Sequence, residues 1–266
     1  MSVYSAFIRN AFLAMLAYRL RYYTGIVTYL LFVSVHYFIW CAVFADLPPG
    51  STIHGFSMPE MVTYVAVGWI ARSLYFSNID DEIDDLVRSG QIAIYLLRPV
   101  SFHAMMLSQA AGESLFRLCF FSLPIGIVIL MAFPVAPPAT ASAMALFLLA
   151  TAASFVIFAE INFLVGLLAF ATKSTQGVMR AKYYLVQLLS GLLLPLTFFP
   201  HWAQSILNTL PFKAITYVPL TLYLGKVPNG EVVQLLCEQL LWCVAFVGLS
   251  EHFWSRATAS LTLQGG

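Results

Sequence analysis

Charged side chains are scarce in this sequence. Only 9% of its 266 residues are Asp, Glu, Lys or Arg, whereas about 25% is usual in soluble domains. Hydrophobic residues make up 61% of the chain, and the mean hydropathy is +0.85. This composition excludes an ordinary soluble domain and indicates an integral membrane protein. The formal net charge of +1 offers no basic surface, so nucleic acid is not an expected partner.

Several motifs of catalysis and cofactor binding are also missing. The chain has no GxxxxGK[ST] loop for ATP and no HExxH or GxSxG motif, and its five histidines stand singly. The four cysteines lie in apolar runs without a CxxC pair, which favours reduced, buried side chains over a metal site. We therefore expect no catalytic residue, no cofactor and no metal in this chain.

Six apolar stretches approach the roughly 20 residues that a helix needs to cross a bilayer. They cover residues 22–45, 61–77, 104–133, 141–171, 181–199 and 232–254. These stretches predict an all-α integral membrane protein, with one transmembrane domain of six helices over residues 1–266. Apolar residues recur with helical spacing beside Arg9, which predicts an interfacial helix over residues 1–21. The alternative is that these residues are the first turns of a long first span.

The distribution of Lys and Arg predicts the orientation, because cytoplasmic loops carry an excess of both. Most of the 13 basic residues fall on one side of the expected spans. They are Arg9, Arg19, Arg21, Arg72, Arg88, Arg98, Lys173, Arg180, Lys182 and Arg256. We therefore expect a multi-pass protein of the cell (inner) membrane, in contact with lipid, with both termini and the loop after the second span in the cytoplasm.

Prolines interrupt the apolar segment between the fifth and sixth spans. Pro200, Pro211, Pro219 and Pro228 divide residues 200–231 into pieces too short to cross a bilayer, since proline breaks the interior of a helix. The segment predicts short re-entrant or interfacial helices on the outer side of the membrane. They would either cap a pathway or form an ordinary surface loop.

Some ionisable residues fall inside the expected spans, where charge is costly. Glu113 and Arg117 are four residues apart on the third span, and Glu160 lies on the fourth. Their depths allow an Arg117 to Glu160 bridge between the two helices. Such a network either fixes helix packing or serves ions and substrate. The second possibility corresponds to an ion-coupled secondary transporter.

Five of the 12 acidic residues are concentrated between positions 80 and 85. Asp80, Asp81 and Asp84 match the motif DDxxD, whose carboxylates can hold Mg²⁺ against a diphosphate. That chemistry needs a second aspartate cluster, and the chain has no aspartate after Asp85. A Mg²⁺-dependent, prenyltransferase-like membrane enzyme is therefore only a weak alternative.

The order of these features resembles permease subunits of ABC transporters of the ABC-2 class, in the branch of short six-span permeases. LVRSGQI at 86–92 and LLRP at 96–99 look like one motif of that branch, and LPF at 210–212 with YVP at 217–219 looks like another. The resemblance implies an exporter subunit that forms half of a pathway. It also implies pairing with a second copy or a sister permease, and two separate cytoplasmic ATPase subunits that bind ATP and Mg²⁺.

The resemblance further implies that residues 79–99 form a cytoplasmic coupling element that docks into the ATPase. Ile79, Ile83 and Leu86 have the i, i+4, i+7 spacing of an apolar stripe that we expect to face the ATPase. The expected docking residues are Ile79, Asp80, Asp81, Glu82, Ile83, Asp84, Asp85, Leu86, Arg88 and Gly90, with Gly90 ending the helix. The expected pathway wall contains Tyr29, Phe32, Tyr37 and Leu189. A merely solvated acidic loop is the alternative for residues 79–99.

Overall fold

A computed structural model describes residues 2–17, 20–172 and 174–259. The α-helices are α1 (Val3–Ala17), α2 (Leu20–Phe44), α3 (Met58–Tyr75), α4 (Ile79–Arg88), α5 (Ile92–Leu96), α6 (Phe102–Arg117), α7 (Leu123–Ala132), α8 (Ala141–Gly166), α9 (Gln176–Leu189), α10 (His201–Thr209), α11 (Tyr217–Tyr223) and α12 (Asn229–Ala259). A π-helical turn, η1 (Leu118–Ser122), joins α6 to α7. Three 3₁₀ turns are η2 (Leu167–Phe170), η3 (Leu196–Phe198) and η4 (Pro211–Ala214). Strands β1 (Thr52–Ile53) and β2 (Phe56–Ser57) form an antiparallel hairpin.

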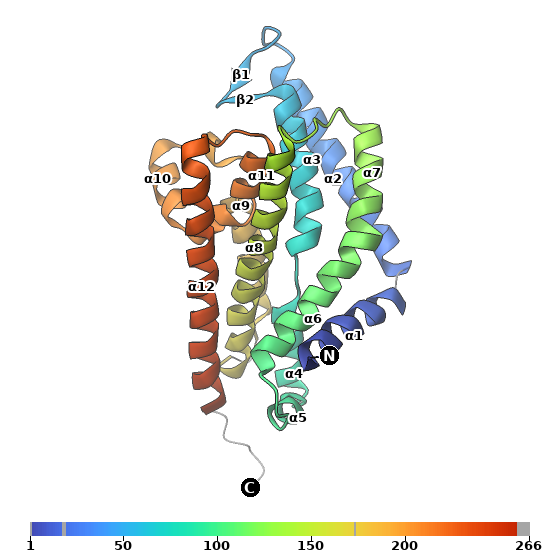
Figure 1. Ribbon diagram of the computed structural model, residues 1–266, viewed down its shortest axis with the longest axis vertical. Coiled ribbons are helices and arrows are strands. Elements are labelled where there is room, and N and C mark those ends of the chain that lie inside the picture. Colours follow the sequence, from blue (N-terminus) through green and yellow to red (C-terminus); the bar gives the residue numbers. More distant parts are fainter. Residues whose placement is uncertain (1, 18–19, 173, 260–266) are drawn as a thin grey trace.

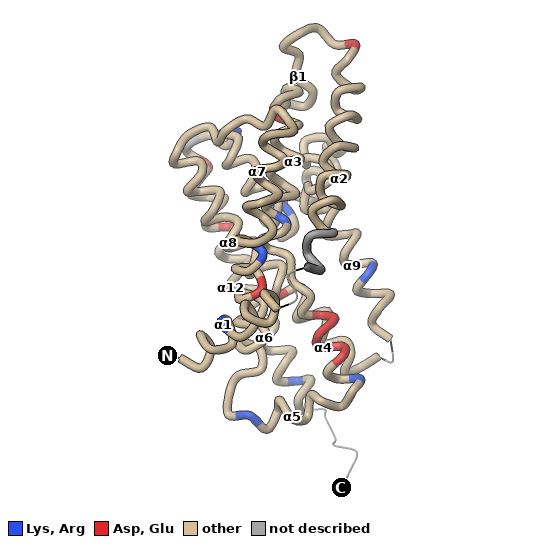
Figure 2. The backbone as a smooth tube through the Cα atoms, turned by 90° about the vertical axis from the view of Figure 1, so that its right-hand side faces the viewer, with Lys and Arg blue, Asp and Glu red and all other residues tan. Residues whose placement is uncertain are grey.

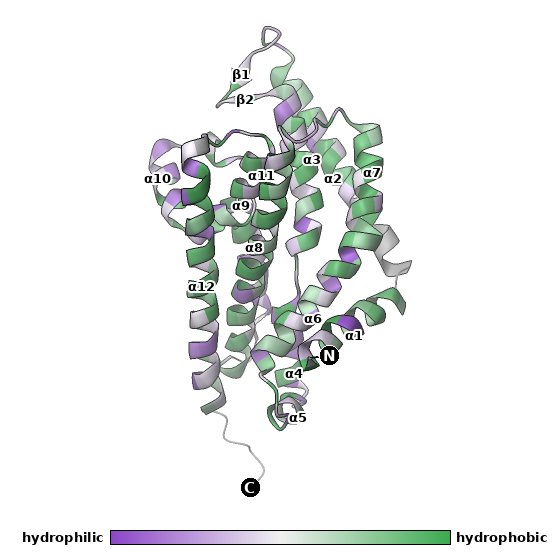
Figure 3. Ribbon diagram, in the orientation of Figure 1, coloured by the Kyte–Doolittle hydropathy of each residue, from purple (hydrophilic) through white to green (hydrophobic). Residues whose placement is uncertain are grey.

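Among the described residues, four helices are long and apolar enough to cross a membrane. They run from Gly25 to Phe44, Phe102 to Ala132, Ala141 to Phe170, and Gly230 to Ala259. Hydrophobic residues dominate α2, α7 and α8 along much of their length (Figure 3). The prediction of an all-α membrane protein is confirmed.

The second and fifth expected spans differ from the other four. Helix α3 is surrounded by protein, with most of its side chains buried. Helix α9 has 14 residues and ends at Leu189, so it is about 21 Å long, which is shorter than a bilayer core of about 30 Å. Gly191 has φ +84°, a left-handed conformation that turns the chain away from the helix. Residues 181–199 are therefore not one continuous helix, and six uninterrupted spans are not confirmed.

Helix α1 is separate from α2 and crosses the outside of α6 (Figure 1). None of its described side chains is fully buried, as expected for a helix at a surface. The crossing is close because α6 has Gly112 there, where a Cβ would overlap the carbonyl oxygen of Ile8. Residues 1, 18 and 19 of the expected interfacial helix lie outside the described residues.

The proline-rich segment forms short helical pieces, as predicted. Pro200 immediately precedes α10, and Pro211 opens η4. Pro219 lies in the first turn of α11, where its missing N–H leaves no helical hydrogen bond unmade. Helix α11 is buried and packs against α8 and α3, so this part of the segment is not an ordinary surface loop.

The α4 and α5 helices lie at the end of the molecule opposite the β-hairpin (Figure 1). The described chain also begins with α1 and ends with α12 at that end. A buried apolar cluster there combines α4 with α6 and α8, through Ile83, Met105 and Phe163 among others. One face of the coupling element predicted from the sequence thus belongs to the core at this end of the bundle.

Candidate functional site

Local sequence explains why α4 forms. Three acidic residues occupy its first turn and Arg88 occupies its last turn, and both placements are favourable to the helix dipole. Ser89 ends the helix, and Gly90 follows with φ +72°. Glycine adopts this conformation without the steric cost of a side chain. The predicted helix end at Gly90 is confirmed.

The apolar stripe of α4 faces the interior of its own chain. Ile79 and Ile83 are 2% and 0% exposed, and they pack among α6 and α8 side chains. Leu86 is half-buried at the edge of the same cluster. Helix α8 has Gly166 at this crossing, where a Cβ would lie 3.0 Å from the Cβ of Ile83. The expectation that Ile79 and Ile83 form a docking stripe for the ATPase is therefore wrong.

Asp80 is also turned inward, although sequence alone placed it in an acidic surface. It is 3% exposed, and its carboxylate accepts a hydrogen bond from Lys182 of α9 at 2.5 Å. The Lys182 ammonium donates a second bond, of 2.6 Å, to Asn162 Oδ1 of α8. Asn162 donates to the carbonyl of Ser77, which precedes α4, at 2.7 Å. These bonds tie α4, α8 and α9 together.

Asp84 makes a second connection to the beginning of α9. It is 4% exposed and accepts from the hydroxyl of Thr175, the residue before α9, at 2.6 Å. Arg88 donates to the other carboxylate oxygen at 2.7 Å. Burial acts to raise the pKa of Asp84, but the hydrogen bonds from Arg88 and Thr175 outweigh it and lower that pKa. Asp80 and Asp84 are therefore held by cationic and hydroxyl side chains of this chain.

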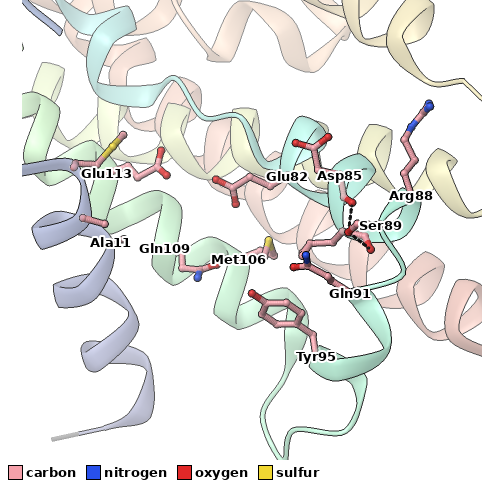
Figure 4. A pocket seen from close by; sticks show the side chains of 13 residues that line it. Ala11, Glu82, Asp85, Arg88, Ser89, Gln91, Tyr95, Met106, Gln109 and Glu113 are labelled. Atoms are coloured by element: carbon pink, nitrogen blue, oxygen red, sulfur yellow. Dashed lines mark hydrogen bonds between the residues drawn. The ribbon is translucent and has the colours of Figure 1, made fainter. Parts of the chain in front are cut away.

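Glu82 points to the other side of α4, towards α6. Its carboxyl faces that of Glu113, and the two side chains border a cavity of about 720 Å³ between α1, α4, α5 and α6 (Figure 4). Burial, together with the charge of Glu113, raises the pKa of Glu82 to about 7. Gln109 also lines this cavity, and its buried Oε1 has no hydrogen-bond partner among the described residues. This side of α4 contains a closely spaced carboxyl pair next to open space.

Several side chains of the predicted docking set do remain at the surface. Asp81, Asp85 and Arg88 are exposed, and so is Gly90. Figure 2 shows the acidic residues of α4 grouped on one segment, with basic residues on neighbouring parts of the chain. Beyond α4, the exposed apolar residues include Ile94 at 58% and Leu97 at 86%. The surface available to a partner is therefore the α4–α5 tip, defined here as the exposed residues between 81 and 98.

The predicted intramembrane network forms only in part. Arg117 is paired with Glu113 at 3.3 Å and donates to the backbone carbonyls of Ser73 and Phe76 at the end of α3. Glu160 instead contacts His103 of α6, whose Nε2 lies 2.9 Å from Glu160 Oε2. Arg117 and Glu160 therefore have other partners among the described residues, and the predicted bridge between them is wrong.

His103 is a residue that sequence reasoning missed. Its Nδ1 lies 2.7 Å from Glu251 Oε1 of α12, so its ring joins α6, α8 and α12. The two glutamates are distant from His103 in sequence, and no local spacing pointed to them. The contact fixes the packing of three long helices at the α4 end of the molecule.

Arg72, which the sequence places among the basic residues of cytoplasmic flanks, is a second residue whose partners sequence reasoning missed. It is buried in the last turn of α3 and donates to the hydroxyls of Tyr29 and Tyr183, at 3.1 and 3.0 Å. Tyr29, from the expected pathway wall, thus serves as a partner inside the chain. Phe32 stacks on Trp69 with ring centroids 4.6 Å apart but remains 43% exposed. The other expected wall residues, Tyr37 and Leu189, are half-buried.

Comparison with known proteins identifies the family. Residues 30–265 match the family described as ABC-2 family transporter protein. No curated protein matches the chain. The matched segment covers nearly the whole chain and includes three of the four long apolar helices and most of the first, in agreement with a multi-pass membrane protein. The chain therefore belongs to the ABC-2 transporter family and is a permease subunit of an ABC transporter.

Proposed function

We propose that this chain is the membrane subunit of an ATP-driven exporter, in which it forms half of the translocation pathway. A second copy or a sister permease forms the other half. Two cytoplasmic ATPase subunits bind and hydrolyse ATP with Mg²⁺. The chain spans the cell (inner) membrane among lipids, with both termini and the α4–α5 tip in the cytoplasm. The excess of Lys and Arg in the corresponding loops supports this orientation.

The α4–α5 tip is the observation that carries this proposal. Ile94 and Leu97 are exposed on this tip, and Asp85, Arg88 and Arg98 are exposed on it too. Protein interfaces usually combine exposed apolar side chains with charged ones. The ATPase thus contacts the tip, while Ile79 and Ile83 anchor α4 to the rest of the permease.

The test is purification of the tagged, full-length chain with its native partners. We expect the wild-type chain to retain an ATP-hydrolysing subunit. The double change Ile94→Asp and Leu97→Asp places two charges at the exposed apolar positions of the tip, so we expect it to remove that subunit without changing membrane insertion. Trp202→Gln, at an exposed position on α10, is the control and leaves the complex intact.

Two results would contradict the proposal. A wild-type preparation without any ATP-hydrolysing subunit rules out the assigned role in an ATP-driven complex. Retention of the subunit by the Ile94→Asp and Leu97→Asp variant rules out the tip as the docking surface.

A further inference from the structure

The two sides of α4 are attached to the permease in different ways. Towards α9, two carboxylates make short bonds: Asp80 with Lys182 at 2.5 Å, and Asp84 with Thr175 at 2.6 Å. All of these acceptor and donor groups are buried or largely buried. Buried hydrogen bonds that involve charged groups are stronger than neutral ones and costly to separate. Movement of α4 away from α9 therefore requires the loss of both bonds.

Helix α9 is held in part by polar contacts, which include these bonds and the one from Arg72 to Tyr183. Most of its side chains are at least partly exposed, and Met179 and Val186 are its buried residues. Lys182, in the middle of the helix, is shared between Asp80 of α4 and Asn162 of α8. A displacement of α4 thus acts on α9 at two points, Lys182 and Thr175, that are separated by nearly two helical turns.

The side of α4 towards α6 combines apolar packing with open space. Glu82 faces Glu113 there; the two carboxyls share a hydrogen bond while Glu82 is protonated, and they repel when both are ionised. The cavity of about 720 Å³ next to this pair gives space into which α4 can shift. The close-packed parts of the interior have no such space, so a helix there cannot shift without displacing its neighbours.

We propose that Asp80, Asp84, Thr175 and Lys182 are positioning residues that make α9 follow α4, so that both helices shift together relative to α1 and α6. The cavity bordered by Glu82 and Glu113 takes up the movement. This inference rests on the proposed function, in which a bound ATPase displaces α4. It assigns the transfer of movement from α4 to α9 to two polar contacts inside this chain.

The experiment follows ATP-dependent exposure of α9 in the intact complex. The four native cysteines are first replaced by alanine, and Leu185, which is 53% exposed on α9, is replaced by cysteine. The rate of maleimide labelling at position 185 is then measured with and without ATP. Asp80→Asn removes the charge that binds Lys182, and Thr175→Val removes only a hydroxyl while keeping the size of the side chain. Asp81→Asn changes an exposed neighbour and is the matched control.

We expect ATP to change the labelling rate in the parent protein and in Asp81→Asn, and we expect the response to be lost when Asp80→Asn and Thr175→Val are combined. The ATPase subunit still co-purifies with every variant, because the altered groups are inside the permease. A purely structural role would lower the thermal stability of the variants but leave the response to ATP. The two single variants each remove one contact and show an intermediate response.

The result that overturns the inference is an unchanged ATP response in the combined variant, or no response in a parent complex that contains the ATPase. Absence of an ATPase subunit from the parent complex is a different outcome. It contradicts the proposed function itself, and with it the step assigned here.

Discussion

The close crossing of α1 over α6 at Gly112 predicts that a larger side chain at this position lowers the stability of the protein. Alanine at this position would place a Cβ against the Ile8 carbonyl oxygen and 2.9 Å from the Cβ of Ala11. Neither atom can rotate away, because one is backbone and the other is fixed to the backbone. The whole of α1 must therefore move outwards, and its contacts with α6 loosen.

The expected loss of stability follows from two opposing effects. Overpacking of this kind costs about 1–3 kcal/mol. Replacement of glycine by alanine in a helix returns about 1 kcal/mol. We expect Gly112→Ala to destabilise the protein by about 1–2 kcal/mol, because the obstacle is backbone. At about 2–4 °C per kcal/mol for a chain of this size, the apparent melting temperature falls by about 2–8 °C.

The assay is thermal unfolding of the purified protein in detergent at a fixed heating rate, since membrane proteins commonly unfold irreversibly. Gly248→Ala is the matched control: it lies within α12, and a Cβ there would have no neighbour within 4 Å. We expect that variant to be at least as stable as the wild type. Equal melting temperatures for the two variants would refute the close packing of α1 on α6.

Three further predictions concern the α4 end of the molecule. Ile83→Ala removes a fully buried side chain, so we expect a loss of about 2–5 kcal/mol in thermal or denaturant unfolding; no change would show that Ile83 is not in the core. His103→Ala leaves the buried Glu160 carboxylate without this partner and lowers stability by about 1–3 kcal/mol, measured in the same way; His103→Gln, which keeps a donor, should lose less. The folded-state pKa of Glu82, about 7, exceeds its ordinary value of 4.5, so the folded chain holds this proton more tightly than the unfolded chain. The free energy of unfolding therefore falls as pH rises from about 4.5 to about 7. Glu82→Gln should reduce this dependence in melting curves recorded across that range. If the variant kept the pH profile of the wild type, the burial of Glu82 beside Glu113 would be contradicted.

Features that depend on local sequence were predictable. The low content of charge and the long apolar runs indicated a helical membrane protein, because neither can be reconciled with a water-exposed surface. Gly90 ends α4, and the prolines after residue 199 divide that segment into short helices, because both residue types act on the backbone next to them. The order of the expected features, with the motifs at 86–99 and 210–219, indicated the ABC-2 family, which the match over residues 30–265 confirms.

The partners of the polar side chains were not predictable in the same way. The spacing of Ile79 and Ile83 showed that they share one face of a helix, but spacing does not say what covers that face. The cover comes from α6 and α8 of the same chain. Asp80 binds Lys182, and Glu160 binds His103 rather than Arg117. These pairs join helices that are distant in sequence, so they depend on where the helices cross.

The sequence by itself thus determined the class of protein, its family and the helical character of the acidic segment, since composition, motifs and backbone preferences are local properties. Only the tertiary structure decided which side of α4 is bonded to α9 and which borders the cavity. That choice depends on the close crossing at Gly166 and on two buried carboxylates that reach α9, and both arise from packing between distant helices.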